Sequence, residues 1–198
     1  MPRKKLLYTN LYPYHVMARS NNKDNFYVPK DLLWEIFISF LNQAVNKFGV
    51  MVHAFVLMDN HYHLILSTSQ KFDLGVVMQH LQKSVSRTIN KKVGRINHVF
   101  GGPYKASLIQ TPEYYFCVYK YLYRNPINAG LCNELVEYKY STYHTDRIPL
   151  SSPASGIASL IPVKAEDWIN LDEGKKWTRS ISKGVHKTIF SPVVDRPY

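Results

Sequence analysis

The sequence predicts an α+β fold of the ferredoxin-like, split βαβ class, with an antiparallel sheet, helices on one face and an additional C-terminal helix. Short strand-like runs are separated by two segments in which apolar residues recur at helical spacing. The predicted order is strand, helix, strand, strand, helix, strand, followed by a further helix. This pattern covers residues 1–144, and residues 145–198 form a C-terminal appendage with a weaker pattern.

The first strand is predicted over residues 12–20, which alternate and are rich in β-forming residues. The alternation places Tyr14, Val16 and Ala18 on one side of the strand. A polar run at residues 21–25 then forms a turn.

The first helix and a β-hairpin are predicted next. Apolar residues recur at helical spacing over residues 31–48, with Asp31 as the expected cap and Gly49 as the stop signal. Two strand-like runs follow at residues 50–58 and 61–67, and the short polar pair between them predicts a hairpin.

The remaining elements complete the predicted order. The pattern predicts a second helix over residues 74–92 and a fourth strand over residues 104–110. Pro112 opens a third helix, which we expect Asn125-Pro126 to close. The inward face of the second helix is expected to hold Leu74, Val77, Met78, Leu81 and Val85. Beyond Thr145 the pattern weakens, and residues 151–156 resemble a linker.

The charge balance is strongly basic, with a formal net charge of +11 and a pI near 9.6. Residues 1–144 hold 17 Lys+Arg against 8 Asp+Glu, whereas the rest of the chain holds 8 against 6. No acidic residue occurs between Asp73 and Glu113. Such an excess indicates a polyanionic partner. The cations that we expect to contact its phosphate groups are Lys83, Arg87 and Lys91, which form one helical ridge, and Lys105.

Several classes of protein are excluded by composition. The longest apolar runs are only a few residues, so the sequence predicts no membrane span. The basic start of the chain lacks the apolar stretch of a secretion signal, and the two cysteines cannot form a disulfide framework. We therefore expect reduced cysteines and a cytoplasmic protein.

A His-Tyr-His motif lies inside the predicted third strand. His61 and His63 project from the same face, because side chains alternate across a strand. An imidazole pair in this geometry can bind one divalent ion if a third group converges on it. The alternative is a pair of half-buried histidines that are only hydrogen-bonded.

The third helix is rich in tyrosine and supplies a candidate for the converging group. Helical spacing places Tyr114, Val118, Tyr121 and Asn125 on one face. The amide oxygen of Asn125 is an acceptable ligand for Mg²⁺ or Mn²⁺, and imidazole tolerates Mn²⁺. The other tyrosines of this helix are expected to serve in packing: Tyr114, Tyr115, Tyr119 and Tyr123.

These motifs resemble the single-tyrosine transposases of the HUH nuclease group, especially the REP-associated tyrosine transposases of the IS200-like branch. The resemblance covers roughly residues 8–144, and it is specific because two motifs occur at the expected separation. The matching segments are Tyr14-His15-Val16, HAFVLMDNHYHL at 53–64, YLYRNPINAGL at 121–131 and Tyr140-Ser141-Thr142-Tyr143.

The resemblance implies a role for each matching residue. His61 and His63 would bind a divalent metal, Mg²⁺ or Mn²⁺, and Asn125 falls where relatives place a third polar ligand. Tyr121, carried by the additional C-terminal helix, would be the nucleophile. The implied activity is cleavage and rejoining of single-stranded DNA near hairpins through a 5′-phosphotyrosine intermediate. The implied partner is single-stranded or hairpin DNA, which the cations named above would contact. The implied location is the cytoplasm of a bacterial type of cell, at the nucleoid when the protein is bound to DNA.

One departure from the family keeps alternatives open. Many relatives have an arginine before the Tyr-Lys of the fourth strand, where this chain has Pro103. The sequence therefore leaves open whether this copy is active. The alternatives are a non-catalytic hairpin-binding relative, a metal-dependent phosphoesterase that uses water, and, last, a basic structural protein. The sequence also leaves open whether the protein is a monomer or a homodimer.

Overall fold

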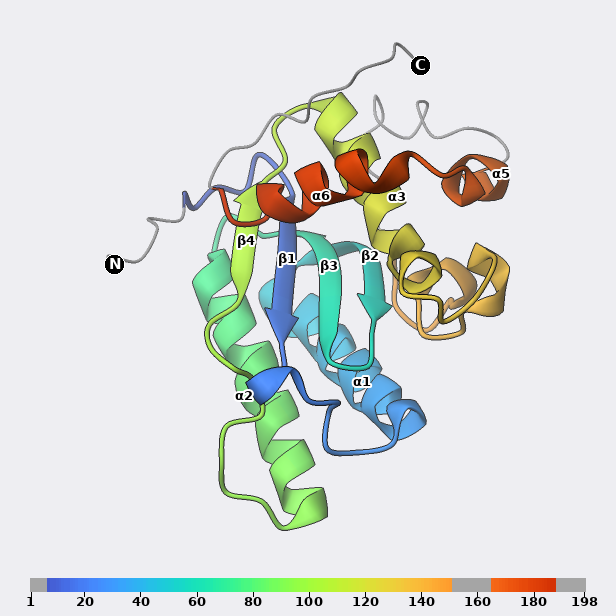
Figure 1. Cartoon of the computed structure of the whole chain (residues 1–198). Helices are drawn as coiled ribbons and strands as arrows, with labels where there is room; N and C mark the ends of the chain where they lie inside the picture. The colour runs from blue at the N-terminus through green and yellow to red at the C-terminus, as the bar shows by residue number, and fades with distance from the viewer. Residues whose placement is uncertain (1–6, 151–164, 188–198) are drawn as a thin grey trace.

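A four-stranded antiparallel sheet forms the centre of the protein, in a computed structural model that describes residues 7–150 and 165–187 (Figure 1). The predicted linker at residues 151–156 lies outside the described residues. The strand order is β2-β3-β1-β4, and every neighbouring pair is antiparallel, which confirms the ferredoxin-like prediction. The strands are β1 (Tyr14–Arg19), β2 (Met51–Leu57), β3 (His61–Ser67) and β4 (Lys105–Leu108).

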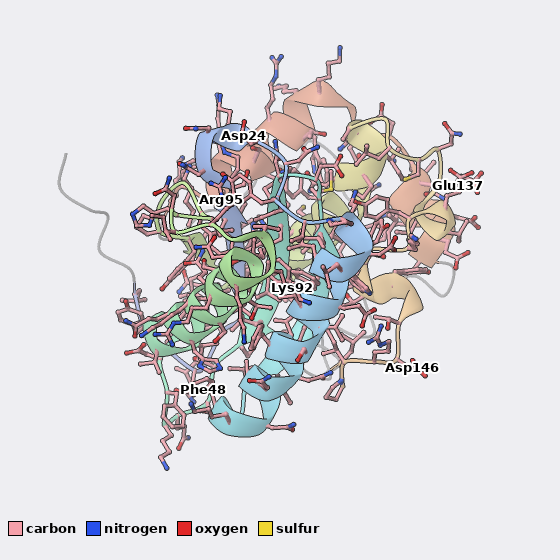
Figure 2. The ribbon with its side chains drawn as sticks, turned by 90° about the horizontal axis from the view of Figure 1, so that it is seen from below. Asp24, Phe48, Lys92, Arg95, Glu137 and Asp146 are labelled. Carbon is pink, nitrogen blue, oxygen red and sulfur yellow. The ribbon has the colours of Figure 1, made fainter. Side chains whose placement is uncertain are left out.

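Two long helices cover one face of this sheet. They are α1 (Lys30–Phe48) and α2 (Leu74–Val93), which lie side by side in the view from below (Figure 2). Gly49 ends α1 in the left-handed conformation, as expected. Asp31 is not the cap that the sequence predicted, because the helix begins one residue earlier and Asp31 lies within its first turn. There its carboxylate still opposes the positive end of the helix dipole.

The sheet separates two hydrophobic cores. On the side of α1 and α2, alternate residues of β1 and β3 pack against the helices, including Tyr14, Val16, Ala18, Tyr62 and Leu64. The whole predicted inward face of α2 is buried. On the other side, β2 and β3 pack against α3 (Pro112–Asn128), with Ala54, Val56 and Ile65 in contact with its buried residues. The additional helix after β4 therefore lies on the face opposite to α1 and α2.

Different residues determine where α3 starts and where it ends. Thr111 caps the start, because its side chain accepts a hydrogen bond from the backbone N–H of Tyr114 at 3.2 Å. The prediction that Asn125-Pro126 closes the helix is wrong, since α3 continues to Asn128 with Pro126 inside it. Pro126 lies in the last turn, where its missing N–H removes only one backbone hydrogen bond. Asn125 therefore keeps helical geometry.

The C-terminal part of the chain contains two helices despite its weak sequence pattern. They are α5 (Ala165–Asn170) and α6 (Gly174–Gly184), and both contact α3. In Figure 1, α6 crosses in front of β1 and β3, on the side opposite to α1 and α2. Within the described residues there are also three short 3-10 helices: Asn21–Lys23, Leu135–Glu137 and Thr142–His144. No helix among residues 7–150 and 165–187 is long and apolar enough to cross a membrane.

Candidate functional site

Three histidines gather on the α3 face of the sheet. His61 and His63 lie on this face of β3, as the alternation predicted, and His15 of β1 joins them. Nε2 of His15 lies 3.0 Å from Nδ1 of His63. The ring centroids of His61 and His63 are 5.2 Å apart, and the rings are nearly perpendicular. The antiparallel sheet brings these imidazoles together, because β1 and β3 are neighbours.

The hydrogen bonds of His61 and His63 fit a pair of metal ligands. Nδ1 of His61 contacts the side-chain oxygen of Asn60 at 2.7 Å, and Nδ1 of His63 contacts His15. Nε2 of each ring is thus the nitrogen that is available to a cation. Metal-binding histidines usually make such a contact through the second ring nitrogen, because it fixes the ring and its tautomer.

These imidazoles need a further ligand of another type. Among the described residues, no group of three His, Cys, Asp or Glu side chains could hold a metal ion. An amide oxygen, water or an oxygen of a bound substrate could complete the coordination. Burial is the main reason why the pKa of His15 falls to about 3 and that of His61 to about 4. Burial also lowers the pKa of His63, so these rings are neutral at pH 7, as ligation requires.

Tyr121 of α3 packs directly against the histidines. Its ring centroid lies 5.3 Å from that of His63 and 6.0 Å from that of His15, in edge-on geometry. Tyr121 is 5% exposed. Burial raises the pKa of its hydroxyl, while hydrogen bonds with Ser182 and Asn125 act in the opposite direction. The hydroxyl is therefore protonated at neutral pH in this conformation.

Asn125 lies one helical turn after Tyr121. Its side-chain nitrogen donates a hydrogen bond to the backbone carbonyl of Tyr121 at 2.8 Å. The nitrogen is used within the helix, which leaves the amide oxygen as the atom that could bind a cation.

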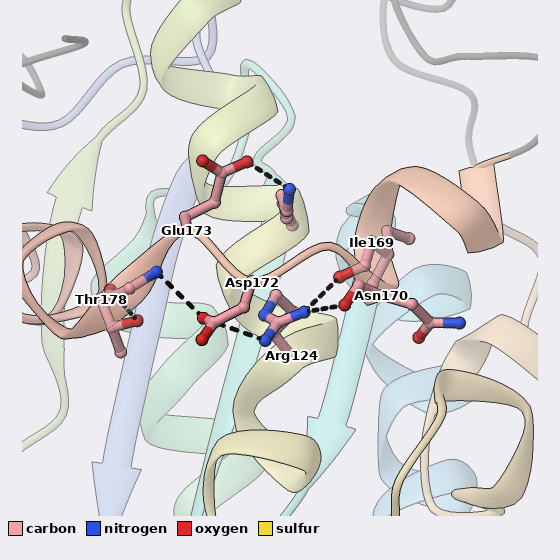
Figure 3. A network of polar contacts seen from close by, with 8 residues as sticks. Arg124, Ile169, Asn170, Asp172, Glu173 and Thr178 are labelled. Atoms are coloured by element: carbon pink, nitrogen blue, oxygen red, sulfur yellow. Dashed lines mark hydrogen bonds and ion pairs between the residues drawn. The ribbon is translucent and has the colours of Figure 1, made fainter. Parts of the chain in front are cut away.

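The α5–α6 segment is fixed to α3 by buried polar contacts (Figure 3). The ammonium group of Lys120 pairs with Glu173, and the Lys120 side chain is fully buried. The guanidinium group of Arg124 donates to the backbone carbonyl of Ile169 at 3.0 Å and contacts Asp172 at 3.3 Å. These contacts hold the start of α6 against α3.

Further along, α6 reaches the histidine face. Ser182 lies near enough to the Tyr121 hydroxyl to lower its pKa, and Nε2 of His186 lies 3.4 Å from the ammonium nitrogen of Lys105. Ile181 and Val185 are buried beneath the helix. The C-terminal segment therefore covers part of the candidate site.

Comparison with known proteins assigns the family. A family model described as "Transposase IS200 like" matches residues 8–124, which is more than half of the chain. The chain belongs to the IS200-like transposase family. No curated protein matches this transposase sequence. The match spans His15, His61, His63 and Tyr121, and it confirms the resemblance seen in the sequence.

Solved structures support the fold of this IS200-like transposase. A REP-associated tyrosine transposase bound to a REP hairpin is similar with a TM-score of 0.63 and 14% sequence identity, over 73% of this chain and 84% of that chain. A second structure is that of a Deinococcus radiodurans R1 protein whose assignment as a transposase is provisional. It gives a TM-score of 0.42 and 14% identity, over 57% of this chain and 88% of that chain, which is too weak to add support.

The predicted site residues of the transposase fall into two groups. The structure brings Tyr121 and Asn125 to the same face as His61 and His63, and Lys105 lies exposed on the adjoining strand. The predicted DNA-binding ridge is exposed on α2, which covers the opposite face of the sheet. The sheet lies between this ridge and the histidines, so the ridge cannot contact the same phosphate as Tyr121. The residues of that ridge are Lys83, Arg87 and Lys91.

Three residues of the site were not identified as functional from the sequence. The sequence analysis named His15 only within a segment that matches the family and gave it no role. Alternation along β1 already places it on the side opposite to the apolar residues. Ser182 and His186 lie in the region with the weakest pattern. The spacing of Trp177, Ile181 and Val185 is the only local sign of a helix there.

Proposed function

We propose that this transposase cleaves and rejoins single-stranded DNA beside hairpins, with Tyr121 as the nucleophile and His61, His63 and Asn125 as the residues that would hold a divalent metal. The observation that carries the proposal is the packing of the Tyr121 ring against His63, at 5.3 Å between centroids. A phosphate bound beside these two rings would lie within reach of both the hydroxyl and the imidazole nitrogens. The family match supports this choice over chemistry unrelated to DNA.

The proposed reaction exchanges one phosphodiester bond for another. The hydroxyl oxygen of Tyr121 attacks the scissile phosphorus and releases its proton, and the bond from phosphorus to the 3′ oxygen breaks. The 3′ oxygen takes up a proton, so the products are a 3′-hydroxyl and a 5′-phosphotyrosine. A 3′-hydroxyl then attacks the phosphotyrosine and rejoins the strand. Because one ester replaces another, no nucleotide cofactor is consumed.

A divalent metal, Mg²⁺ or Mn²⁺, would supply electrostatic stabilisation of the charge that develops on the phosphate. The chain's own contribution is to orient the ligands. His15 and Asn60 fix the rings of His63 and His61 through their Nδ1 atoms. The neutral state of these imidazoles at pH 7 keeps them ready to bind.

Little of Tyr121 is exposed in the described conformation, at 5%. Ser182 of α6 lies near enough to the hydroxyl to influence its pKa. We expect α6 to move away from α3 when a DNA strand is bound at the hydroxyl. Its displacement would also hydrate the hydroxyl, which removes the main cause of the raised pKa.

The test is formation of a covalent adduct by the full chain. Strands that carry a hairpin and a single-stranded flank are incubated with Mg²⁺ or Mn²⁺, and SDS-stable adducts are separated by electrophoresis. Tyr121→Phe should abolish the adduct and leave hairpin binding intact. The matched control is Tyr119→Phe, because Tyr119 lies on the same helix but packs against Tyr115 and Tyr123. An adduct of normal yield with Tyr121→Phe would refute the assignment.

A non-catalytic hairpin-binding protein is the second candidate. It is favoured by the burial of Tyr121 and by the raised pKa of its hydroxyl, because both oppose formation of the phenolate. Binding of hairpin DNA that weakens with salt, without any adduct, would support this alternative. The phosphoesterase alternative predicts cleavage that survives Tyr121→Phe but is lost in His61→Ala. The adduct experiment therefore separates the transposase from both alternatives, and cleavage products measured with Tyr121→Phe and His61→Ala separate the two alternatives from each other.

A further inference from the structure

A polar cavity of about 490 Å³ opens beside the histidines. It is lined by residues 17–23, 101–103 and 105, and we call it the Arg19 pocket. Its walls are the end of β1, the following turn, and the loop that leads into β4. Figure 2 shows Asp24, in the segment after β1, and Arg95, in the loop before β4, toward the same end of the molecule. A hydrogen bond of 2.9 Å from Asn21 N–H to the carbonyl of Val99 joins the loops.

The strand register connects this pocket with the candidate site. Arg19 is paired with His61 across β1 and β3, and Met17 is paired with both His63 and Lys105. Alternation along β1 then places Arg19 on the same face as His15. Lys105 lines the pocket together with Arg19, from the neighbouring strand β4. A strand of DNA whose phosphate lies at His61 would continue directly into the Arg19 pocket.

The pocket carries positive charge that no lining residue neutralises. Arg19, Lys23 and Lys105 line it, and none of its lining residues is acidic. None of these three cations takes part in an ion pair found in the described part of the chain. Exposed cations without acidic partners around a concave surface attract phosphate groups.

The backbone around the pocket has an unusual conformation. Asn22 and Lys23 have φ values of 53° and 65°, which only a few per cent of non-glycine residues adopt. On the facing wall, a Cβ atom at Gly101 would lie 3.0 Å from the backbone oxygen of Ser20, so the two loops approach too closely for a side chain there. Strained backbone of this kind concentrates at binding and active sites.

We propose that the Arg19 pocket holds the nucleotide next to the scissile phosphate and reads its base. This inference rests on the proposed function and adds a specificity-determining site to it. Arg19, Lys23 and Lys105 would contact phosphates. The side-chain amides of Asn21 and Asn22 offer donors and acceptors that match a base edge.

Photocrosslinking locates the nucleotide. Hairpin strands that carry one 5-iodouracil, moved through the single-stranded flank, are irradiated with the full chain, and the crosslinked peptides are sequenced. The expected result is a crosslink to residues 17–23 or 101–105 from the position next to the adduct site. If no adduct forms, the same crosslinks from one flank position still support the pocket. Crosslinks confined to α2 or to the C-terminal helices would overturn it.

Variants measure the contribution of the pocket to affinity and base preference. Arg19→Ala should weaken binding of the hairpin strand about tenfold and reduce the slope of log K against log[salt] by about 0.7, because one phosphate of a single strand is no longer neutralised. Lys47→Ala is the matched control, since Lys47 is exposed and adjoins Phe48, which Figure 2 places at the opposite end from Asp24. Equal affinities for Arg19→Ala and Lys47→Ala would overturn the proposal.

A separate measurement tests whether the Arg19 pocket recognises the base of the bound nucleotide. Removing the base at the crosslinked position should lower the affinity of the unmodified protein and have a smaller effect on Asn22→Ala. An equal loss in both proteins would show that the pocket holds the phosphate without reading the base. Failure of this pocket does not affect the adduct assay with Tyr121→Phe, so the two proposals can fail separately.

Discussion

Nε2 of His15 lies 3.0 Å from Nδ1 of His63, so one imidazole of the cluster orients another. If the Nδ1 atom of His63 carries the proton, its Nε2 atom presents a lone pair toward the face on which Tyr121 packs. Nε2 of His15 then accepts a hydrogen bond from His63, and His15 carries its own hydrogen on Nδ1, which is buried and has no hydrogen-bond partner in the described part of the chain. His15 is thus a positioning residue for the proposed metal site.

Replacement of His15 should weaken metal binding. His15→Phe keeps an aromatic ring in the strand but removes the acceptor for His63, so we expect the affinity for Mn²⁺ to fall about tenfold or more. The measurement is Mn²⁺ titration followed by electron paramagnetic resonance. His15→Gln, which can still accept a hydrogen bond, should restore part of the affinity. The control is His98→Gln, at an exposed position. Unchanged affinity in His15→Phe would contradict the positioning role.

Acid should destabilise the metal-free protein through the buried histidines. The pKa of His15 is about 3 and that of His61 about 4 in the folded protein, against 6.5 when unperturbed. At pH values between the folded and the unperturbed pKa, the unfolded chain binds protons that the folded chain does not. The free energy of unfolding therefore falls as the pH falls from 6.5 toward 4. His15 alone would contribute about 1.4 kcal/mol per pH unit.

The measurement for this prediction is urea unfolding in EDTA between pH 7.5 and pH 4.5. His15→Gln should give a shallower dependence of the free energy of unfolding on pH than the unmodified protein. Carboxyl groups titrate in both proteins, so only the difference between the two slopes reports on His15. Identical slopes would contradict the prediction.

The contact between Lys120 and Glu173 should control the attachment of α6. Lys120 is fully buried, whereas Glu173 is 30% exposed, so Glu173→Ala would leave a buried ammonium group without its partner. We expect a loss of about 1–3 kcal/mol in the stability of the α5–α6 segment. Amide hydrogen exchange should therefore become faster in α5 and α6, while β1 and β3 stay protected.

A matched exposed ion pair provides the control for this experiment. Arg147 and Glu35 pair at 2.6 Å with about half of each side chain exposed, so Glu35→Ala should cost less than about 1 kcal/mol. If Glu173→Ala and Glu35→Ala change exchange in α6 equally, the buried contact does not hold the segment.

The basic ridge on α2 should bind the hairpin stem rather than the strand that is cut. Lys83, Arg87 and Lys91 are exposed on the face of the molecule opposite to Tyr121. Their combined replacement with Ala should weaken binding of a hairpin more than that of an unstructured strand of equal length. The salt slope for the hairpin should fall by about 0.9 for each duplex phosphate that the variant no longer neutralises. Equal losses of affinity for both substrates would contradict this assignment.

The central fold was predictable because its signals are local. Alternation along β1 placed Tyr14, Val16 and Ala18 on one side, and the structure buries all three in one core. The errors concern helix ends, where one residue decides the outcome. Asp31 looked like a cap but lies inside α1, and Pro126 looked like a stop but is tolerated in the last turn of α3.

The candidate site was predictable only in part. His61, His63 and Tyr121 lie in motifs, whereas the contact of His15 with His63 spans 48 residues and depends on strand pairing. The pairing of Lys120 with Glu173 spans 53 residues and has no local signature. Contacts between segments so far apart follow from packing, which hydrophobic periodicity does not encode.

The two sides of the sheet pack separately, so substitutions at neighbouring positions of one strand should have different effects. In β1, even-numbered positions from Tyr14 to Ala18 support the scaffold, and odd-numbered positions from His15 to Arg19 face the chemistry. A substitution at an odd position should therefore change what the protein does while it still folds. A substitution at an even position should first reduce the amount of folded protein. A mutational scan of six consecutive residues would then alternate between two phenotypes with the period of the strand itself.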